Sequence, residues 1–218
     1  MLRLIICAVP WVLFYGWCLS FGRREKDWKS APVRDAVIAI LGYAGAVAAC
    51  AHSREQTIMC IVTATLTAIV LAASSREDMR SGQFYIWPLA ACLTGNSVVA
   101  FWCSRSQEGT PPLNKEAFAV IFILIALRIG KLAVGDCFIY VTCWLSFRIL
   151  FCEQSFLAFF LMLFVSTVLG IATWTVRLIC RKGFHTKFPF TAQIASGCLV
   201  TYLLSGYFVA AGIGRQVY

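Results

Sequence analysis

Acidic residues are scarce in this chain of 218 amino acids, which holds 10 Asp and Glu against 19 Lys and Arg. Charged residues make up only 13% of the sequence, about half their share in soluble globular domains, while 60% is hydrophobic. No tract of soluble composition is long enough for an extramembrane domain. The composition therefore predicts an all-α, polytopic integral membrane protein, with residues 1–218 forming a single membrane domain.

Paired cysteine motifs are also missing. None of the eleven Cys residues forms a C-x-x-C pair, and nearly all lie inside apolar runs, where free Cys behaves as a small hydrophobe. A disulfide framework, a structural metal and a cofactor are therefore not expected. The basic residues are dispersed through short loops instead of forming one patch, so the net charge of +9 predicts membrane lipid as a partner and no nucleic acid.

Apolar segments recur along the whole chain at the length of about 20 residues that a helix needs to cross a bilayer. The eight predicted transmembrane helices cover residues 4–21, 36–52, 57–74, 84–103, 117–133, 137–152, 156–176 and 190–212. The first segment is preceded by only Arg3 and lacks an A-x-A cleavage site, so we expect a retained span and not a signal peptide. Alternating loops place thirteen of the 19 basic residues on one side, which predicts that both termini lie outside the cytoplasm.

Small residues line one face of the predicted helix 36–52, at Gly42, Gly45, Ala46 and Ala49. Such a face lets another helix approach closely, which indicates packing within the chain in preference to dimerisation.

Two aspartates fall at the same predicted depth on the cytoplasmic side. Asp78 closes the turn after the helix 57–74, and Asp136 opens the helix 137–152. Close carboxylates cannot both ionise cheaply, so one holds a proton while the other is charged. Such a pair can activate water and polarise a carbonyl, which is acid–base hydrolysis of an amide without a covalent intermediate.

Each aspartate also has a purely structural interpretation. Asp136 precedes an apolar helix as an N-cap would, and Asp78 has Arg76 and Arg80 as neighbours for ion pairs. Spacing alone leaves both interpretations open.

Three separate segments resemble the type IV prepilin peptidases, the bacterial branch of the G-x-G-D membrane aspartyl proteases. These segments are EDMRSGQFYIWPL, which contains Asp78, AVGDCFIYVTCWL, which contains Gly135 and Asp136, and KFPFTAQIASG, which contains Pro189, Phe190 and Gly197. The likeness covers nearly the whole chain in order and spacing.

This resemblance implies a multi-pass protein of the bacterial inner membrane with Asp78 and Asp136 as catalytic residues. The implied reaction is cleavage of the leader peptide of prepilins or pseudopilins at the cytoplasmic face. Gly135, Pro189 and Phe190 would position the substrate, and recognition of the basic leader would need Glu77 or another acid near the site.

The sequence departs from the family at several positions. Ala133 replaces the first glycine of G-x-G-D, and Phe84, Tyr85 and Ile86 replace an I-P-N tripeptide. The loop at 22–35 is too short for the zinc-binding domain of long family members and has no cysteine, so the chain resembles the short form. S-adenosylmethionine would be needed only if the protein also methylated its product.

Two other function classes fit a small helical membrane protein. A transporter or channel would use the acids as a proton or cation relay, although no acid lies near the centre of a predicted span. A non-catalytic protein of pilus assembly would resemble a peptidase without cleaving a peptide.

Overall fold

The structure is a computed structural model that describes Ala8, Trp11, Val12 and residues 32–52, 58–81, 86–106, 113–130, 132–151, 154–179 and 190–210. These residues form helices throughout, apart from Gly130, Leu132 and Ala133, which are not helical. The helices are α2 (Pro32–His52), α3 (Ile58–Ser81), α4 (Ile86–Ser106), α5 (Leu113–Ile129), α6 (Val134–Phe151), α7 (Ser155–Ile179) and α8 (Phe190–Ala210). The all-α prediction is confirmed for the described residues. The segment 4–21 lies outside them apart from three residues.

The helix boundaries depend on prolines and polar residues as well as on the apolar segments. Proline is the first residue of α2 and the third of α4, within the first turn, where a missing backbone N–H costs no helical hydrogen bond. α3 runs seven residues beyond the predicted end at 74, so the prediction that Asp78 lies in a turn was wrong. The polar sequence SSREDMRS continues the helix, which carries Asp78 on its last turn.

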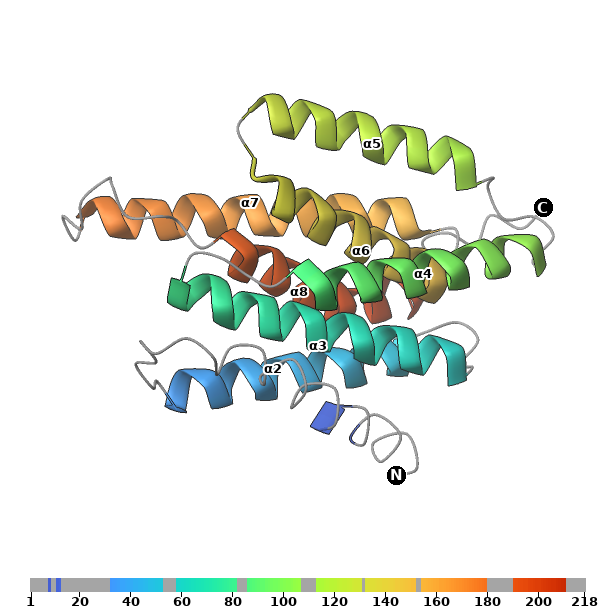
Figure 1. The fold of residues 1–218 in the computed structure, drawn as a ribbon, viewed down its shortest axis with the longest axis horizontal. Helices are drawn as coiled ribbons and strands as arrows, with labels where there is room; N and C mark the ends of the chain where they lie inside the picture. Colours follow the sequence, from blue (N-terminus) through green and yellow to red (C-terminus); the bar gives the residue numbers. More distant parts are fainter. Residues whose placement is uncertain are drawn as a thin grey trace.

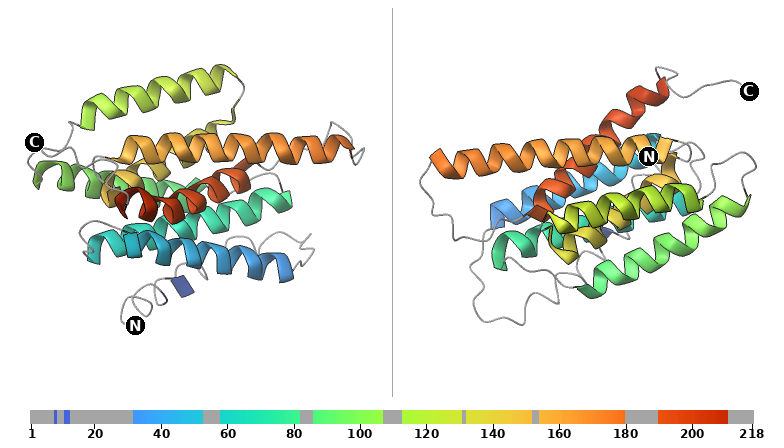
Figure 2. Two further views of the ribbon diagram at one scale, coloured as in Figure 1. Left: turned by 180° about the vertical axis from the view of Figure 1, so that it is seen from behind. Right: turned by 90° about the horizontal axis from the view of Figure 1, so that it is seen from above.

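Three helices make the centre of the bundle, since α3, α6 and α8 all contact one another. α2 covers α3 and α8, α4 packs on α6 and α3, and α7 lies along α8 and α6. Figure 1 and the rear view in Figure 2 show α5 on the outside, above α7 and α6. The ends of α3, α5 and α7 and the starts of α2, α6 and α8 lie toward the same side in Figure 1, so one end of the bundle gathers the predicted cytoplasmic segments.

Polar side chains hold the helices together inside the apolar core. The Asn96 amide donates to Thr67 Oγ1 at 3.0 Å and to the Thr142 carbonyl at 3.4 Å, which joins α4 to α3 and α6. At the end away from Asp136, the Arg148 guanidinium donates to Glu116 at 2.9 Å and Ser155 donates to the same carboxylate at 2.8 Å. This buried ion pair fastens the start of α5 to α6 and α7.

The small-residue face of α2 packs within the chain, as predicted. A methyl group added at Gly42 would lie 3.0 Å from Ala72 Cβ of α3, and one added at Gly45 would lie 2.9 Å from Leu199 of α8. Ala46 is fully buried.

Two of the described helices are long and apolar enough to cross a membrane, namely Val134–Phe151 and Ser155–Ile179. Shorter apolar stretches occur at Ala36–Val47, Ile86–Trp102 and Phe190–Leu204.

Substitution of Gly197 tests the close contact between α7 and α8. A methyl group there would lie 2.8 Å from the Met162 carbonyl oxygen and 3.2 Å from the Ser166 amide nitrogen, and neither backbone atom can turn aside. We expect Gly197→Ala to lower the free energy of unfolding by about 1–3 kcal/mol. Thermal unfolding in detergent measures the effect.

Gly95→Ala is the matched control, because nothing lies within 4 Å of the added methyl on α4. It should leave the protein equally stable or about 0.5–1 kcal/mol more stable. Equal melting temperatures for the two variants would show that α7 and α8 do not approach so closely.

Candidate active site

The last turn of α3 and the first turn of α6 bring Asp78 and Asp136 to the start of α8. The connection before α6 is tight: the Leu132 amide donates to the Leu127 carbonyl at 3.0 Å, and Arg128 donates to the Leu132 carbonyl at 2.9 Å. Asp136 is the third residue of α6, and the first helical bond, from the Cys137 amide, goes to Ala133. Ala133 therefore caps the helix, so the N-cap interpretation of Asp136 was wrong.

Thr191 joins the two aspartates. Its backbone N–H donates to Asp78 Oδ2 at 3.0 Å, and its hydroxyl donates to Asp136 Oδ1 at 3.2 Å. Thr191 is the second residue of α8 and is 1% exposed, while Asp136 is 7% exposed. The free N–H groups and the positive end of a helix favour negative charge at this position.

Burial shapes the electrostatics of this pair. Partial burial raises the pKa of Asp78 above its usual 3.8, and the hydrogen bonds from Thr191 only partly oppose the shift. Asp136 is more deeply buried, and the charge of Asp78 acts on it directly. A second negative charge in this site is therefore costly, as expected for two neighbouring carboxylates.

The other predicted site residues lie around this pair. Gly135 is the second residue of α6, directly before Asp136. Phe190 begins α8, and its ring packs on α7, where a methyl group added at Gly170 would lie 3.0 Å from Phe190 Cε2. Arg76 donates to Glu77 at 2.7 Å, so the Glu77 carboxylate is engaged within α3. Pro189 lies outside the described residues.

Sequence reasoning missed Thr191 although it named the residue before it. A hydroxyl residue near a helix start is common as an ordinary cap, so its type carried no specific signal. The detectable signal was the position, because a helix start at the depth of two acids offers them its free N–H groups.

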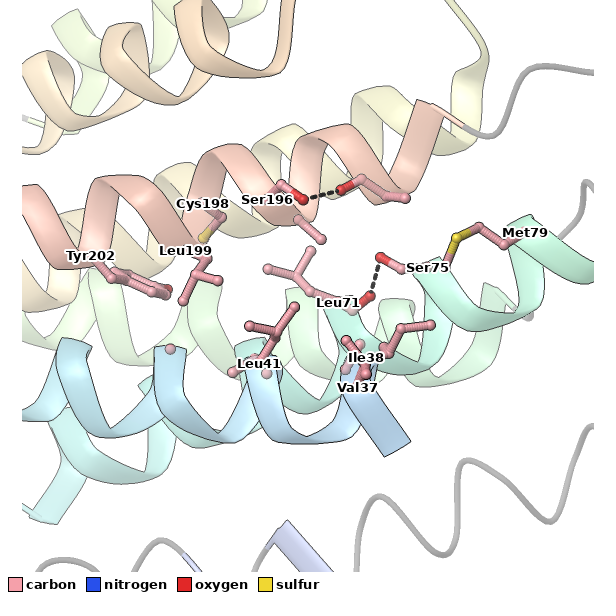
Figure 3. A pocket seen from close by; sticks show the side chains of 16 residues that line it. Val37, Ile38, Leu41, Leu71, Ser75, Met79, Ser196, Cys198, Leu199 and Tyr202 are labelled. Carbon is pink, nitrogen blue, oxygen red and sulfur yellow. Dashed lines mark hydrogen bonds between the residues drawn. The ribbon is translucent and has the colours of Figure 1, made fainter. Parts of the chain in front are cut away.

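An apolar groove lies between α2, α3 and α8, and neither aspartate lines it. Its volume is about 390 Å³, and Figure 3 shows Ser75 and Met79 at one end. The lining also includes Ala192, and Met79 and Ala192 are the sequence neighbours of Asp78 and Thr191. The Ser75 hydroxyl lies 3.5 Å from the Thr191 carbonyl oxygen. Figure 3 shows Leu41, Leu71 and Leu199 along the groove, with Tyr202 at the far end. The groove and the two carboxylates are thus connected through adjacent residues of α3 and α8.

Within the described residues, no three His, Cys, Asp or Glu side chains cluster as a metal site would require. The described residues of this site offer carboxylates, a hydroxyl and backbone N–H groups.

No protein-family model matches the sequence, and no curated protein and no solved structure matches the chain.

Replacing Asp78 with Asn tests the cost of the buried carboxylate. Because the folded state raises the pKa of Asp78, it binds the proton more tightly than the unfolded chain, and stability is lost as pH rises above about 4. Asn keeps an acceptor for the Thr191 N–H without the charge. We expect the melting temperature of Asp78→Asn to exceed that of the wild type by an amount that grows from pH 4 and levels off once Asp78 is ionised.

Glu116→Gln is the contrasting control, because it removes the carboxylate that faces the buried Arg148 guanidinium and should lower the melting temperature. A variant at Asp78 that melts below the wild type at pH 7.5 would contradict the proposed desolvation cost.

Proposed function

We propose that this protein is a membrane aspartyl endopeptidase in which Asp78 and Asp136 activate water for hydrolysis of a peptide bond. The observation that carries the proposal is Thr191, which donates one hydrogen bond to each carboxylate. Two acids from two different helices therefore share one partner at the start of a third.

The chemistry follows from two carboxylates that share one proton. The ionised carboxylate takes a proton from water, and the protonated one polarises the carbonyl of the scissile bond. The proposed reaction uses only these groups and water, so it requires no cofactor.

The substrate class in this proposal is the prepilins and pseudopilins, whose basic leader precedes a hydrophobic helix. The groove is lined mainly by apolar side chains and includes Met79 and Ala192, the sequence neighbours of Asp78 and Thr191, which suits a hydrophobic segment that continues beyond a cleavage site. The resemblance in the segments around Asp78, Asp136 and Phe190 supports the same substrate class. Glu77 would interact with the leader only through a carboxylate that already pairs with Arg76.

We place the site at the cytoplasmic face of a bacterial inner membrane, in a chain that crosses it eight times with both termini outside. Large apolar side chains are exposed on the outer helices, including Phe118 and Phe122 on α5 and Phe164 and Trp174 on α7. An outer surface of this kind suits lipid better than water. Arg128 and Arg177, in the last turns of α5 and α7, lie at the Asp136 end, as a cytoplasmic location requires.

Cleavage of a co-expressed prepilin tests the function directly. Asp78→Asn and Asp136→Asn should each lower cleavage by at least about a hundredfold, because Asn can neither accept nor supply the catalytic proton. A gel mobility shift measures leader removal, and the amount of each variant in the membrane must equal that of the wild type.

Glu108→Gln is the control for an acid-to-amide change, since the charge count puts Glu108 on the opposite face of the membrane. Full cleavage by either aspartate variant would remove that residue from the mechanism. No cleavage by the wild type on several prepilins would favour a non-catalytic role in pilus assembly.

A matched pair of serines tests the groove. Ser196 on α8 lines the groove, whereas Ser97 on α4 does not, and both are exposed and donate to the carbonyl four residues earlier. We expect Ser196→Phe to raise KM by about tenfold, equivalent to about 1.4 kcal/mol of binding. Ser97→Phe should leave KM unchanged, and equal values for the two variants would show that the substrate does not use the groove.

A further inference from the structure

The two hydrogen bonds from Thr191 are chemically unequal. A backbone N–H can only donate, so Asp78 Oδ2 must offer it a lone pair. A hydroxyl can donate or accept, so Thr191 Oγ1 can serve Asp136 Oδ1 whether or not that oxygen carries a proton. Asp136 therefore has a partner that suits both protonation states, whereas the partner of Asp78 favours the carboxylate.

Burial likewise favours the proton on Asp136 and the negative charge on Asp78. Asp136 is only 7% exposed and Asp78 is half-buried, so negative charge is more costly on Asp136. Among the described residues, the titratable groups that act on Asp136 or feel its charge are Asp78 on α3 and Cys137 and Tyr140 on α6.

On α3, Arg76 and Glu77 directly precede Asp78 and pair with each other at 2.7 Å. Arg128, at the end of α5, acts on Cys137, and Arg177 is in the last turn of α7. α4 has no charged residue between 86 and 104, and α8 offers the Thr191 hydroxyl, which does not titrate.

We propose that Asp136 holds the proton shared by the pair and acts as the acid, that Asp78 is the base, and that Thr191 is the positioning residue that fixes this division. The assignment rests on the proposed peptidase function and deepens it, because it gives each carboxylate one task.

With this assignment, each aspartate regains its starting protonation state by the end of the reaction. Asp78 takes a proton from water as the water oxygen bonds to the carbonyl carbon, and Asp136 gives its proton to the carbonyl oxygen, forming a gem-diol. The C–N bond then breaks as Asp78 returns its proton to the amine nitrogen and a gem-diol hydroxyl returns a proton to Asp136. The products are a carboxylic acid and an amine, and the pair regains its starting state.

Substitutions at position 191 separate the two hydrogen bonds. Thr191→Val keeps the shape and the backbone N–H but removes the hydroxyl, and Thr191→Ser keeps the hydroxyl. We expect Thr191→Val to lower kcat/KM for prepilin cleavage by about 10–100-fold, as loss of a hydrogen bond to a charged group does. Thr191→Ser should stay close to the wild type.

The pH profile of kcat/KM identifies which aspartate is the acid. Without the hydroxyl, an ionised Asp136 loses a donor, so its proton is held more tightly. If Asp136 is the acid, the basic limb for Thr191→Val moves up by about one pH unit and the acidic limb stays. Movement of the acidic limb alone would assign Asp136 as the base and overturn the proposal, as would unmoved limbs or failure of Ser to preserve activity.

A measurement without substrate keeps the proposal testable if Thr191→Val does not fold. Infrared difference spectra of the purified protein follow the carboxyl band of Asp136 in Asp78→Asn and that of Asp78 in Asp136→Asn. The proposal expects Asp136 to lose its proton at the higher pH, and the reverse order would overturn it. Wild-type protein that cleaves no prepilin but titrates in the expected order would refute the peptidase function and leave the proton assignment intact.

Discussion

Burial of carboxylates at the end of an apolar bundle costs free energy, and the start of α8 offsets part of that cost here. The free N–H groups and the positive end of α8 face two acids that come from α3 and α6. This single junction fixes the position of three helix ends. The close α7–α8 contact at Gly197 and the Phe190 ring against α7 both hold the start of α8 in place. Packing of α8 against α7 therefore keeps Thr191 in position to bind both aspartates.

The sequence predicted the helical class and the meeting of Asp78 with Asp136 because both depend on strong, simple signals. Apolar runs of membrane length define the helices, and rare acids at one predicted depth define the pair. The small residues of α2 predicted close packing for an equally direct reason, since Gly42 and Gly45 leave no side chain between helices.

Other features could not be predicted because they depend on partners distant in the sequence. Polar residues 75–81 read as a loop, yet they continue α3, where they meet α8: the Ser75 hydroxyl lies 3.5 Å from the Thr191 carbonyl oxygen, and Asp78 accepts from the Thr191 N–H. The role of Thr191 depends on where α3 and α6 end, which no local pattern near position 191 records. The ion pair of Arg148 with Glu116 likewise joins residues whose helices are related only by the fold.

The link between α8 and Asp78 is made by a backbone atom and is therefore independent of the amino acid at position 191. Only proline, which has no backbone N–H, would abolish it. The hydrogen bond to Asp136 comes from the Thr191 side chain, so almost any substitution at position 191 changes it. Over evolutionary time, mutation at this one codon can retune one acid of the pair while the other keeps its partner.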